Sequence, residues 1–377
     1  MAKPVVACVV GTRPEAIKMA PVVLALREHR DEVETLLVST GQHREMLEQA
    51  LGAFDLAPDH DLAIMQHGQT LAEVTARALA GLDGLLERLE PQMVVGQGDT
   101  TTTFCAFLAA FYRGIPSAHV EAGLRTDRID NPFPEEFNRR AAGLVASLHF
   151  PPTHWAADNL RREGKAECDL FVTGNTGIDA VQAIAPRLPQ EWAPDHAGRV
   201  LVLTTHRREN WGEPQREIAR AVRTVVDQTP DTLLIVPMHR NPRVREVLEA
   251  ELGGHARIQL IDPPEYPRFV KLMQRATLIL TDSGGVQEEA PAFGVPVLVL
   301  RETTERPEGV DAGTAKLVGT DRATIEREAL ALLGDETAYR RMAHAVSPYG
   351  DGMAARRIAS VILRRLGLGA NEVPMWG

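Results

Sequence analysis

Cysteine, aromatic residues and long apolar runs are scarce in this chain of 377 residues. The three cysteines, Cys8, Cys105 and Cys168, lie far apart and have no metal-binding or redox spacing, so we expect buried free thiols in a reducing compartment. No apolar stretch approaches the ~18 residues of a membrane span, and the run Val5–Val10 ends too early for a signal core. A cytoplasmic protein without a membrane partner is expected.

Net positive charge is also missing. The formal net charge of -10 argues against nucleic acid or an anionic membrane surface as a partner. It does not argue against a small anionic ligand, because basic residues still cluster locally. A hydrophobic content of 44% and a charged content of 24% are typical of a soluble α/β protein.

The length and the pattern of apolar runs predict two domains. Single cores stop growing near roughly 250–300 residues. Short apolar runs alternate with stretches of helical period, which indicates doubly wound parallel sheets with a ligand cleft between two Rossmann-like domains. Prolines 186, 189 and 194 mark a linker. We expect domains at residues 1–174 and 175–352, and a C-terminal helix within about 353–377 that packs back onto the first.

The stretch Thr281–Pro291 is the most informative segment, because it follows the apolar run Ala276–Leu280 and opens a helical pattern. Backbone N–H groups at a helix start attract anions, and Gly284 and Gly285 allow a phosphate to approach closely. We therefore predict a diphosphate-binding turn. Glu288 and Glu289 follow one turn later, where they could bind a ribose diol; helix capping alone is the alternative.

A second anion-facing loop, Gly11–Lys18, follows the first predicted strand. Pro14 suits the first turn of a helix, and Arg13 projects from the loop itself. The alternative is an ordinary helix start in which Arg13 and Lys18 are solvated surface charges.

Three carboxylates follow strands in the first half: Asp99, Glu121 and Glu135. Loops at the carboxyl ends of parallel strands build the sites of α/β proteins, so we expect these side chains to come together. Carboxylates in one site raise one another's pKa, which permits general acid–base chemistry near neutral pH. The alternatives are separate structural roles: helix caps for Asp99 and Glu135, and an ion pair between Glu121 and Arg125.

Basic residues follow two strands in the second half. His206, Arg207 and Arg208 end one strand and His239 ends the next, and they are expected to face the diphosphate turn. A histidine after a strand is more often structural than catalytic. No spacing indicates a metal and no serine lies in a nucleophile elbow, so acid–base chemistry on an anionic nucleotide is the interpretation.

Taken in order, these motifs resemble the non-hydrolysing UDP-N-acetylglucosamine 2-epimerases over nearly the whole chain. The matching segments are Gly11–Lys18, Gln42–Arg44, Gly98–Thr100, Glu121–Arg125, Pro134–Glu136, Thr173–Asn175, His206–Glu209, Asp282–Gly285 and Thr304–Glu308.

The resemblance implies a glycosyltransferase-B type fold and an isomerase that needs no cofactor or metal. It implies reversible inversion at C2 of UDP-N-acetylglucosamine, by elimination of UDP to a 2-acetamidoglucal and re-addition, which supplies a polysaccharide precursor. It implies catalytic roles for Asp99, Glu121, Glu135 and His206. It implies substrate contacts for Arg13, Lys18, Arg207, His239, Phe269, Ser283, Gly284, Gly285 and Glu289. We also expect a homodimer.

The sequence departs from part of this family at a second, activating UDP-N-acetylglucosamine site. The residues concerned are Gln42, Arg44, Glu45 and His67, with Glu45 at a position where those members have glutamine and Gly68 where they have arginine. Loss of a charge-assisted contact predicts weak activation, although Arg44 or His67 could substitute.

Three other functions stay open at this stage. They are an epimerase of a related 2-acetamido UDP-sugar, a UDP-sugar glycosyltransferase on the same fold, and a sensor that binds without turnover. The three carboxylates favour proton transfer over the last two.

Overall fold

The computed structural model describes residues 3–41, 44–66, 68–126, 128–369 and 371–377. The chain divides into two compact units. Unit 1 comprises Met1–Ala183 and Tyr349–Gly377, and unit 2 comprises Ile184–Pro348. Each unit is described by itself below.

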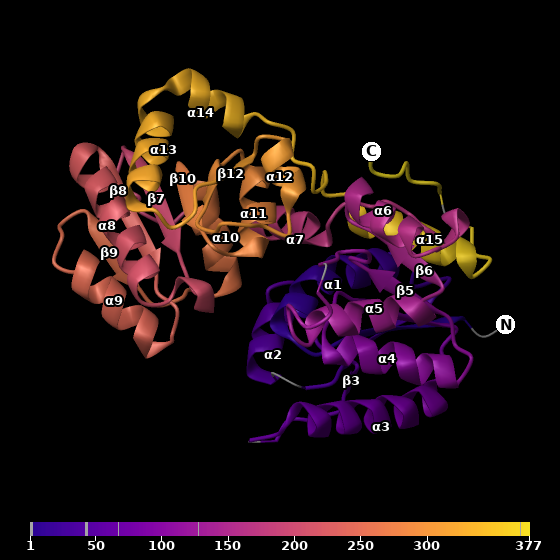
Figure 1. Cartoon of the computed structure of the whole chain (residues 1–377). Coiled ribbons are helices and arrows are strands. Elements are labelled where there is room, and N and C mark those ends of the chain that lie inside the picture. The colour runs from indigo at the N-terminus through magenta and orange to yellow at the C-terminus, as the bar shows by residue number, and fades with distance from the viewer. Residues whose placement is uncertain (1–2, 42–43, 67, 127, 370) are drawn as a thin grey trace. The chain divides into compact units, whose positions relative to one another are not determined.

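Unit 1 is a doubly wound parallel sheet covered by helices (Figure 1). In its described part the six strands run in the order β3-β2-β1-β4-β5-β6. The strands are β1 (Val5–Val10), β2 (Glu34–Ser39), β3 (His60–Asp61), β4 (Met93–Gln97), β5 (Ser117–Val120) and β6 (Leu148–Phe150). The helices are α1 (Arg13–Arg27), α2 (Arg44–Gly52), α3 (Leu71–Leu89), α4 (Thr101–Tyr112), α5 (Glu135–Val145), α6 (His154–Arg162), α7 (Thr176–Ile184) and α15 (Ala354–Arg365), with a short 3-10 helix at Glu167–Asp169.

Unit 2 repeats this architecture. Its six described strands run in the order β12-β11-β10-β7-β8-β9, and all neighbouring pairs are parallel. The strands are β7 (Arg199–Thr204), β8 (Thr232–Pro237), β9 (Ile258–Ile261), β10 (Leu278–Thr281), β11 (Val297–Val299) and β12 (Ala315–Leu317). The helices are α8 (Glu213–Gln228), α9 (Pro242–Leu252), α10 (Tyr266–Arg275), α11 (Gly284–Glu289), α12 (Pro307–Asp311), α13 (Arg322–Gly334) and α14 (Glu336–Ala343), with 3-10 turns at Ala185–Arg187, Arg208–Asn210 and Ala290–Phe293.

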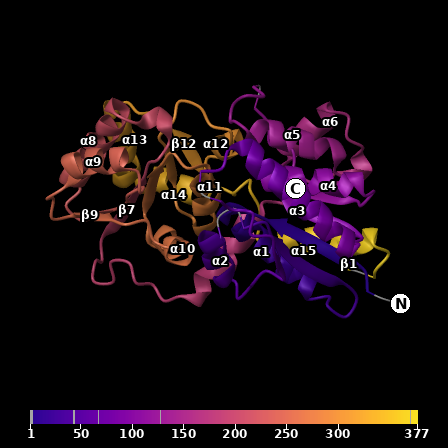
Figure 2. The same ribbon diagram turned by 90° about the horizontal axis from the view of Figure 1, so that it is seen from below.

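Buried apolar strands explain both sheets. The central strands β4, β8 and β10 are buried along their whole length, as expected for strands covered by helices on both faces. In unit 2, α8 and α13 lie side by side over one face of the sheet (Figure 2) and contribute Ile218, Val222 and Ile325 to its core. The predicted fold class, two doubly wound Rossmann-like parallel sheets, is confirmed.

The C-terminal helix α15 belongs to unit 1, where it packs on α1 at the other end of the chain (Figure 1). Asp179 of α7 accepts hydrogen bonds from the first amides of α15, at 3.3 Å from Ala354 N and 2.9 Å from Ala355 N. Because α7 is tied to α15 in this way, unit 1 extends to Ala183, past the limit of 174 expected from the sequence.

Some elements differ from the sequence-based expectation. The sequence predicts a strand at the short apolar run Leu170–Val172, but this run forms none; only Leu170 bridges to His149 of β6. None of the short edge strands β3, β6 and β12 is predicted from the sequence, because two or three residues carry too little periodic signal. Cys168 is exposed rather than buried, whereas Cys8 and Cys105 are buried.

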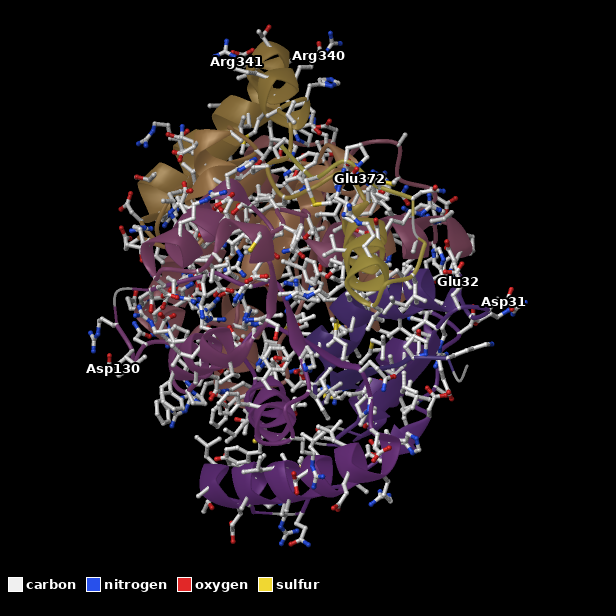
Figure 3. All side chains as sticks on the ribbon, turned by 90° about the vertical axis from the view of Figure 1, so that its right-hand side faces the viewer. Asp31, Glu32, Asp130, Arg340, Arg341 and Glu372 are labelled. Carbon is white, nitrogen blue, oxygen red and sulfur yellow. The ribbon has the colours of Figure 1, made fainter. Side chains whose placement is uncertain are left out.

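The surface is charged. Side chains such as Asp31, Asp130 and Arg341 project outward (Figure 3) and are exposed. Within the residues that the structure describes, no helix is both long and apolar enough to cross a membrane.

Candidate active site

The strand order reverses once in each sheet, and ligands of such folds bind where it does. In unit 1 the reversal lies between β1 and β4, and in unit 2 between β7 and β10. The loops behind these four strands begin at Gly11, Gly98, Thr205 and Asp282. Of the site residues predicted from the sequence, these loops hold Asp99, His206, Arg207 and Ser283, and Arg13 and Gly284 begin the helices that follow two of them.

Glu121 directly follows β5 in a left-handed backbone conformation, with φ of 58°. Both of its carboxylate oxygens accept from Lys18 Nζ of α1, at 2.7 and 2.8 Å, and Gln97 Nε2 at the end of β4 donates to Oε2. Arg125 instead donates to Glu163. The alternative of a Glu121–Arg125 pair is therefore wrong, and Lys18 is not a solvated surface charge.

Asp99 lies in the loop behind β4, where Arg139 of α5 forms an ion pair with its carboxylate. Asn138 Nδ2 donates to the backbone oxygen of Asp99 at 3.0 Å. The N-cap of α4 is Thr100, so Asp99 does not cap that helix. Arg139 and Asn138 were not predicted as site residues. Nothing in the local sequence of α5 indicates that this helix contacts the loop behind β4.

Glu135 is the first residue of α5, and its side chain is half-buried. No described residue forms a hydrogen bond or ion pair with its carboxylate. Helix α5 thus carries one of the three predicted carboxylates and supplies the partners of a second, Asp99. Asp99 and Glu121 are each paired with a cation, so ion pairing, not the expected repulsion among three carboxylates, dominates this end of the sheet.

Arg13 is the first residue of α1 and is half-buried; no described residue pairs with its guanidinium. The helix is capped by Thr12 and Glu15, whose side chain reaches back to the Thr12 amide at 2.7 Å. Glu15 is fully buried, and burial raises the pKa of its carboxyl.

In unit 2, the buried carboxylate of Asp282 organises the loop behind β7. It accepts from the backbone amides of His206 and Arg207 at 3.0 Å, from Thr205 Oγ1 at 2.9 Å and from Asn210 Nδ2 at 3.0 Å. Burial alone would raise the pKa of Asp282, but the neighbouring His206 and these amides lower it on balance.

His206 and His239 lie together at the ends of β7 and β8. His206 Nδ1 is 3.0 Å from Asp282 Oδ1, which orients the ring, and 40% of its side chain is exposed. The ring of His239 stacks on it with centroids 6.0 Å apart. Burial and the nearby His206 lower the pKa of His239. Asp282 therefore orients His206 toward a partly open position where it can act on an anion.

The predicted diphosphate turn begins α11, with Ser283 as its N-cap and Gly284 buried behind it. A Cβ at Gly284 would lie 2.7 Å from Arg306 Cζ, so the guanidinium packs directly on this glycine. Arg306 in turn pairs with Glu288 at 2.7 Å. Glu288 is thus engaged with Arg306, and Glu289, the residue expected at the ribose, is buried in the same helix.

A cluster of arginines surrounds Glu305 close to this turn. Arg207 Nη2 lies 3.3 Å from Glu305, Arg306 Nη1 lies 3.6 Å away, and Arg301 also pairs with it. Although burial opposes ionisation, these cations bring the pKa of Glu305 down to about 2. Arg207 is thereby held by a carboxylate.

The remaining predicted residues are less defined by contacts. Phe269 is half-buried on α10, and Gly285 follows Gly284 in α11. Of the predicted activator residues, Gln42 and His67 lie outside the described residues, as does the side chain of Arg44. Glu45 is exposed in the first turn of α2. Among the described residues, no group of three His, Cys, Asp or Glu side chains could hold a metal ion.

Comparison with known proteins agrees with this arrangement. The family model for UDP-N-acetylglucosamine 2-epimerase matches residues 24–363. The UDP-N-acetylglucosamine 2-epimerase of Bacillus subtilis is 50% identical over 369 residues, covering 97% of each chain, and that of Escherichia coli K12 is 48% identical over 365 residues, covering 94% of this chain and 97% of the relative. The UDP-GlcNAc 2-epimerase of Neisseria meningitidis, solved bound to UDP-GlcNAc, is 43% identical with a TM-score of 0.89 and covers 96% of this chain and 100% of that chain.

Proposed function

Because the chain belongs to the UDP-N-acetylglucosamine 2-epimerase family, we propose that it interconverts UDP-N-acetylglucosamine and UDP-N-acetylmannosamine by inverting C2 of the sugar. The observation that carries this proposal is the family match over almost the whole chain, with every predicted catalytic carboxylate present.

The proposed reaction is an elimination followed by an addition. A base removes the C2 proton while the C1–O bond breaks, which gives UDP and a 2-acetamidoglucal. UDP then adds back to C1 as a proton returns to the opposite face of C2. Asp99, Glu121 and Glu135 are the candidate acid–base groups, because each follows a strand of unit 1.

The contacts of these carboxylates support distinct positions for them. Lys18 and Gln97 fix the Glu121 carboxylate from two elements, and Arg139 fixes Asp99. Restraint of this kind holds a catalytic group in the geometry that the transition state needs. Glu135, which no described side chain restrains, is the group best able to follow the substrate.

Unit 2 residues are proposed to bind UDP and to stabilise it as the leaving group, since C2 is not acidic and negative charge develops on the diphosphate. The donors in unit 2 are the backbone amides of the Ser283–Gly285 turn and the imidazole of His206. Arg13 is a further candidate donor to the diphosphate by family resemblance. Glu289, His239, Arg207 and Phe269 are assigned to the ribose, the diphosphate and the uracil by family resemblance.

The wider setting is also a proposal. The protein acts in the cytoplasm as a homodimer and supplies a precursor for a cell-surface polysaccharide. It uses no cofactor or metal, so a chelator should leave the rate unchanged.

The decisive experiment is NMR of UDP-N-acetylglucosamine with the protein in deuterated water. Solvent deuterium should appear at C2 of both epimers. Turnover that leaves C2 fully protonated would refute the elimination mechanism. If the true substrate is a related 2-acetamido UDP-sugar, deuterium should appear at C2 of that sugar and not of UDP-N-acetylglucosamine. A glycosyltransferase would instead release UDP only when an acceptor is supplied, and a sensor would bind without turnover.

Activation by a second UDP-N-acetylglucosamine is proposed to be weak, because Glu45 places a negative charge where the diphosphate would bind and Gly68 offers no cation. The reverse reaction, started from UDP-N-acetylmannosamine alone, tests this. A long lag that micromolar UDP-N-acetylglucosamine abolishes would contradict the proposal.

A further inference from the structure

Glu15 is a buried carboxylate that the proposed chemistry does not use. It lies in the first turn of α1 with 1% of its surface exposed. No described lysine, arginine or histidine forms an ion pair with it. Burying a carboxylate without a cation costs folding free energy unless several hydrogen-bond donors satisfy it, so the donors around Glu15 need to be identified.

Its two oxygens accept from two different loops. Oε2 accepts from Gly11 N at 3.0 Å, Thr12 N at 2.7 Å and Thr12 Oγ1 at 2.8 Å, all in the loop behind β1. Oε1 accepts from Thr100 Oγ1, and it lies 3.0 Å from Thr103 Oγ1, whose single proton it shares with Gln97 O at 2.8 Å; both threonines are at the start of α4 behind β4. One side chain therefore joins the two loops that flank the reversal of strand order in unit 1.

Each loop carries a residue assigned to the reaction. Arg13 follows Thr12 directly, and Asp99 precedes Thr100 directly. The loops also pack closely, because a Cβ at Gly11 would lie 2.1 Å from Thr102 Oγ1. A shift of either loop would thus change the separation between a cation assigned to the diphosphate and an acid–base carboxylate.

We infer that Glu15 is a positioning residue, which fixes the loop of Arg13 against the loop of Asp99. The inference rests on the proposed epimerase function and adds a residue to it. Glu15 itself touches no reacting atom; it acts through its hydrogen bonds to Gly11, Thr12, Thr100 and Thr103.

The chain contains a matched control. Helix α3 starts with the same capping box, in which Glu73 Oε2 accepts from Thr70 N at 2.8 Å and Thr70 Oγ1 at 2.9 Å. That box is exposed and bonds only within itself. Glu73→Gln can therefore keep its local cap, because one amide oxygen suffices for it, whereas Glu15→Gln replaces one of the two acceptor oxygens that join the loops by an amide nitrogen.

The experiment compares steady-state kinetics of the full-length variants. Glu15→Gln should lower kcat by about 10–100-fold, the scale of a small misplacement of catalytic groups, while KM stays within about threefold. Glu73→Gln, an exposed change, should keep kcat within about twofold. Calorimetric titration with UDP should still give one site per chain for Glu15→Gln, which shows that the variant is folded.

A second pair of variants tests the link from its other side. Thr103→Val removes the hydroxyl that donates to Glu15 and should lower kcat, whereas Thr103→Ser keeps it and should restore kcat to within about twofold of wild type. The double variant Glu15→Gln/Thr103→Val should be no slower than the slower single variant, because both changes break the same link. This pair decides the question if Glu15→Gln does not fold.

Two results would overturn the inference alone: a Glu15→Gln variant as active as Glu73→Gln, or additive losses in the double variant. Wild-type protein that never exchanges the C2 proton would instead refute the proposed function, and the inference with it.

Discussion

The two units hold their polar strand-end residues in different ways. In unit 1, ion pairs join side chains from separate elements, such as Lys18 with Glu121 and Arg139 with Asp99. In unit 2, the buried carboxylate of Asp282 holds a loop by accepting from the backbone amides of His206 and Arg207. The side chains of Thr205 and Asn210 donate to the same carboxylate. These ion pairs of unit 1 thus fix charged side chains relative to one another, and Asp282 of unit 2 fixes a stretch of loop.

This difference suits two kinds of work. Acid–base chemistry depends on the position and charge of individual side chains, which ion pairs restrain. Binding of a diphosphate depends on backbone amides and nearby cations that must already be in place. Changes in unit 1 should therefore affect kcat, and changes in unit 2 should affect folding and UDP affinity.

The largest expected effect is on turnover. Asp99→Asn, Glu121→Gln and Glu135→Gln should each lower kcat by on the order of 10²–10⁴-fold, because each removes a candidate general acid or base. The changes are nearly isosteric, so UDP binding measured by calorimetry should persist. A folded variant that kept more than about a tenth of wild-type kcat would lose its assigned role.

Asp282→Asn should mainly damage the fold of unit 2. The new amide would point N–H groups at the donors of His206, Arg207 and Asn210, which leaves several of them unsatisfied. We expect the free energy of unfolding to fall by about 2–4 kcal/mol, with loss of UDP binding. Asp335→Asn is the control, because Asp335 is an exposed cap of α14 and should cost about 1 kcal/mol at most. Equal losses in urea denaturation would contradict the buried role of Asp282.

The pH dependence of stability should have opposite signs for one carboxyl in each unit. Glu305 has its pKa lowered to about 2, so the unfolded chain binds a proton first and the stabilisation by Glu305 is lost as pH falls from 4.5 to 2. Asp179 has its pKa raised to about 6, mainly by burial, so the folded chain holds the proton and stability falls as pH rises from 3.8 to 6.

Urea denaturation across this range checks both signs. As pH rises, the free energy of unfolding of the wild type should increase relative to that of Glu305→Gln and decrease relative to that of Asp179→Asn. Each change should be about 1–3 kcal/mol. Parallel pH slopes in the two comparisons would show that the charge environment of one carboxyl is misassigned.

Much of the site could be predicted because parallel strands place their carboxyl ends at one edge. That rule identified Asp99, Glu121 and the loop of His206 without knowledge of their partners. The partners themselves could not be predicted. Glu121 has a local candidate in Arg125, four residues away, but the fold brings it to Lys18, 103 positions away in the sequence.

The central roles of Asp282 and Arg306 were missed for a related reason. Both occur in segments that were singled out, yet nothing in the sequence shows that one carboxylate would accept from an entire neighbouring loop, or that a guanidinium would pack on Gly284. Such contacts depend on how two strands lie side by side, and only the three-dimensional structure supplies that information.

The smallest expected effect sharpens the comparison inside unit 2. Gly284→Ala would place a methyl group 2.7 Å from Arg306 Cζ, so the guanidinium must move although Glu288 holds it. Displacing one charge-assisted donor and crowding the turn should weaken UDP binding about tenfold, with a smaller change in kcat. Gly334→Ala is the control, because a Cβ there meets no atom within 4 Å and the residue lies at the end of α13. Calorimetry with UDP measures both variants. If Gly284→Ala lowered kcat tenfold while UDP affinity stayed unchanged, the turn would serve the reaction rather than binding, and the division of work between the two units would fail.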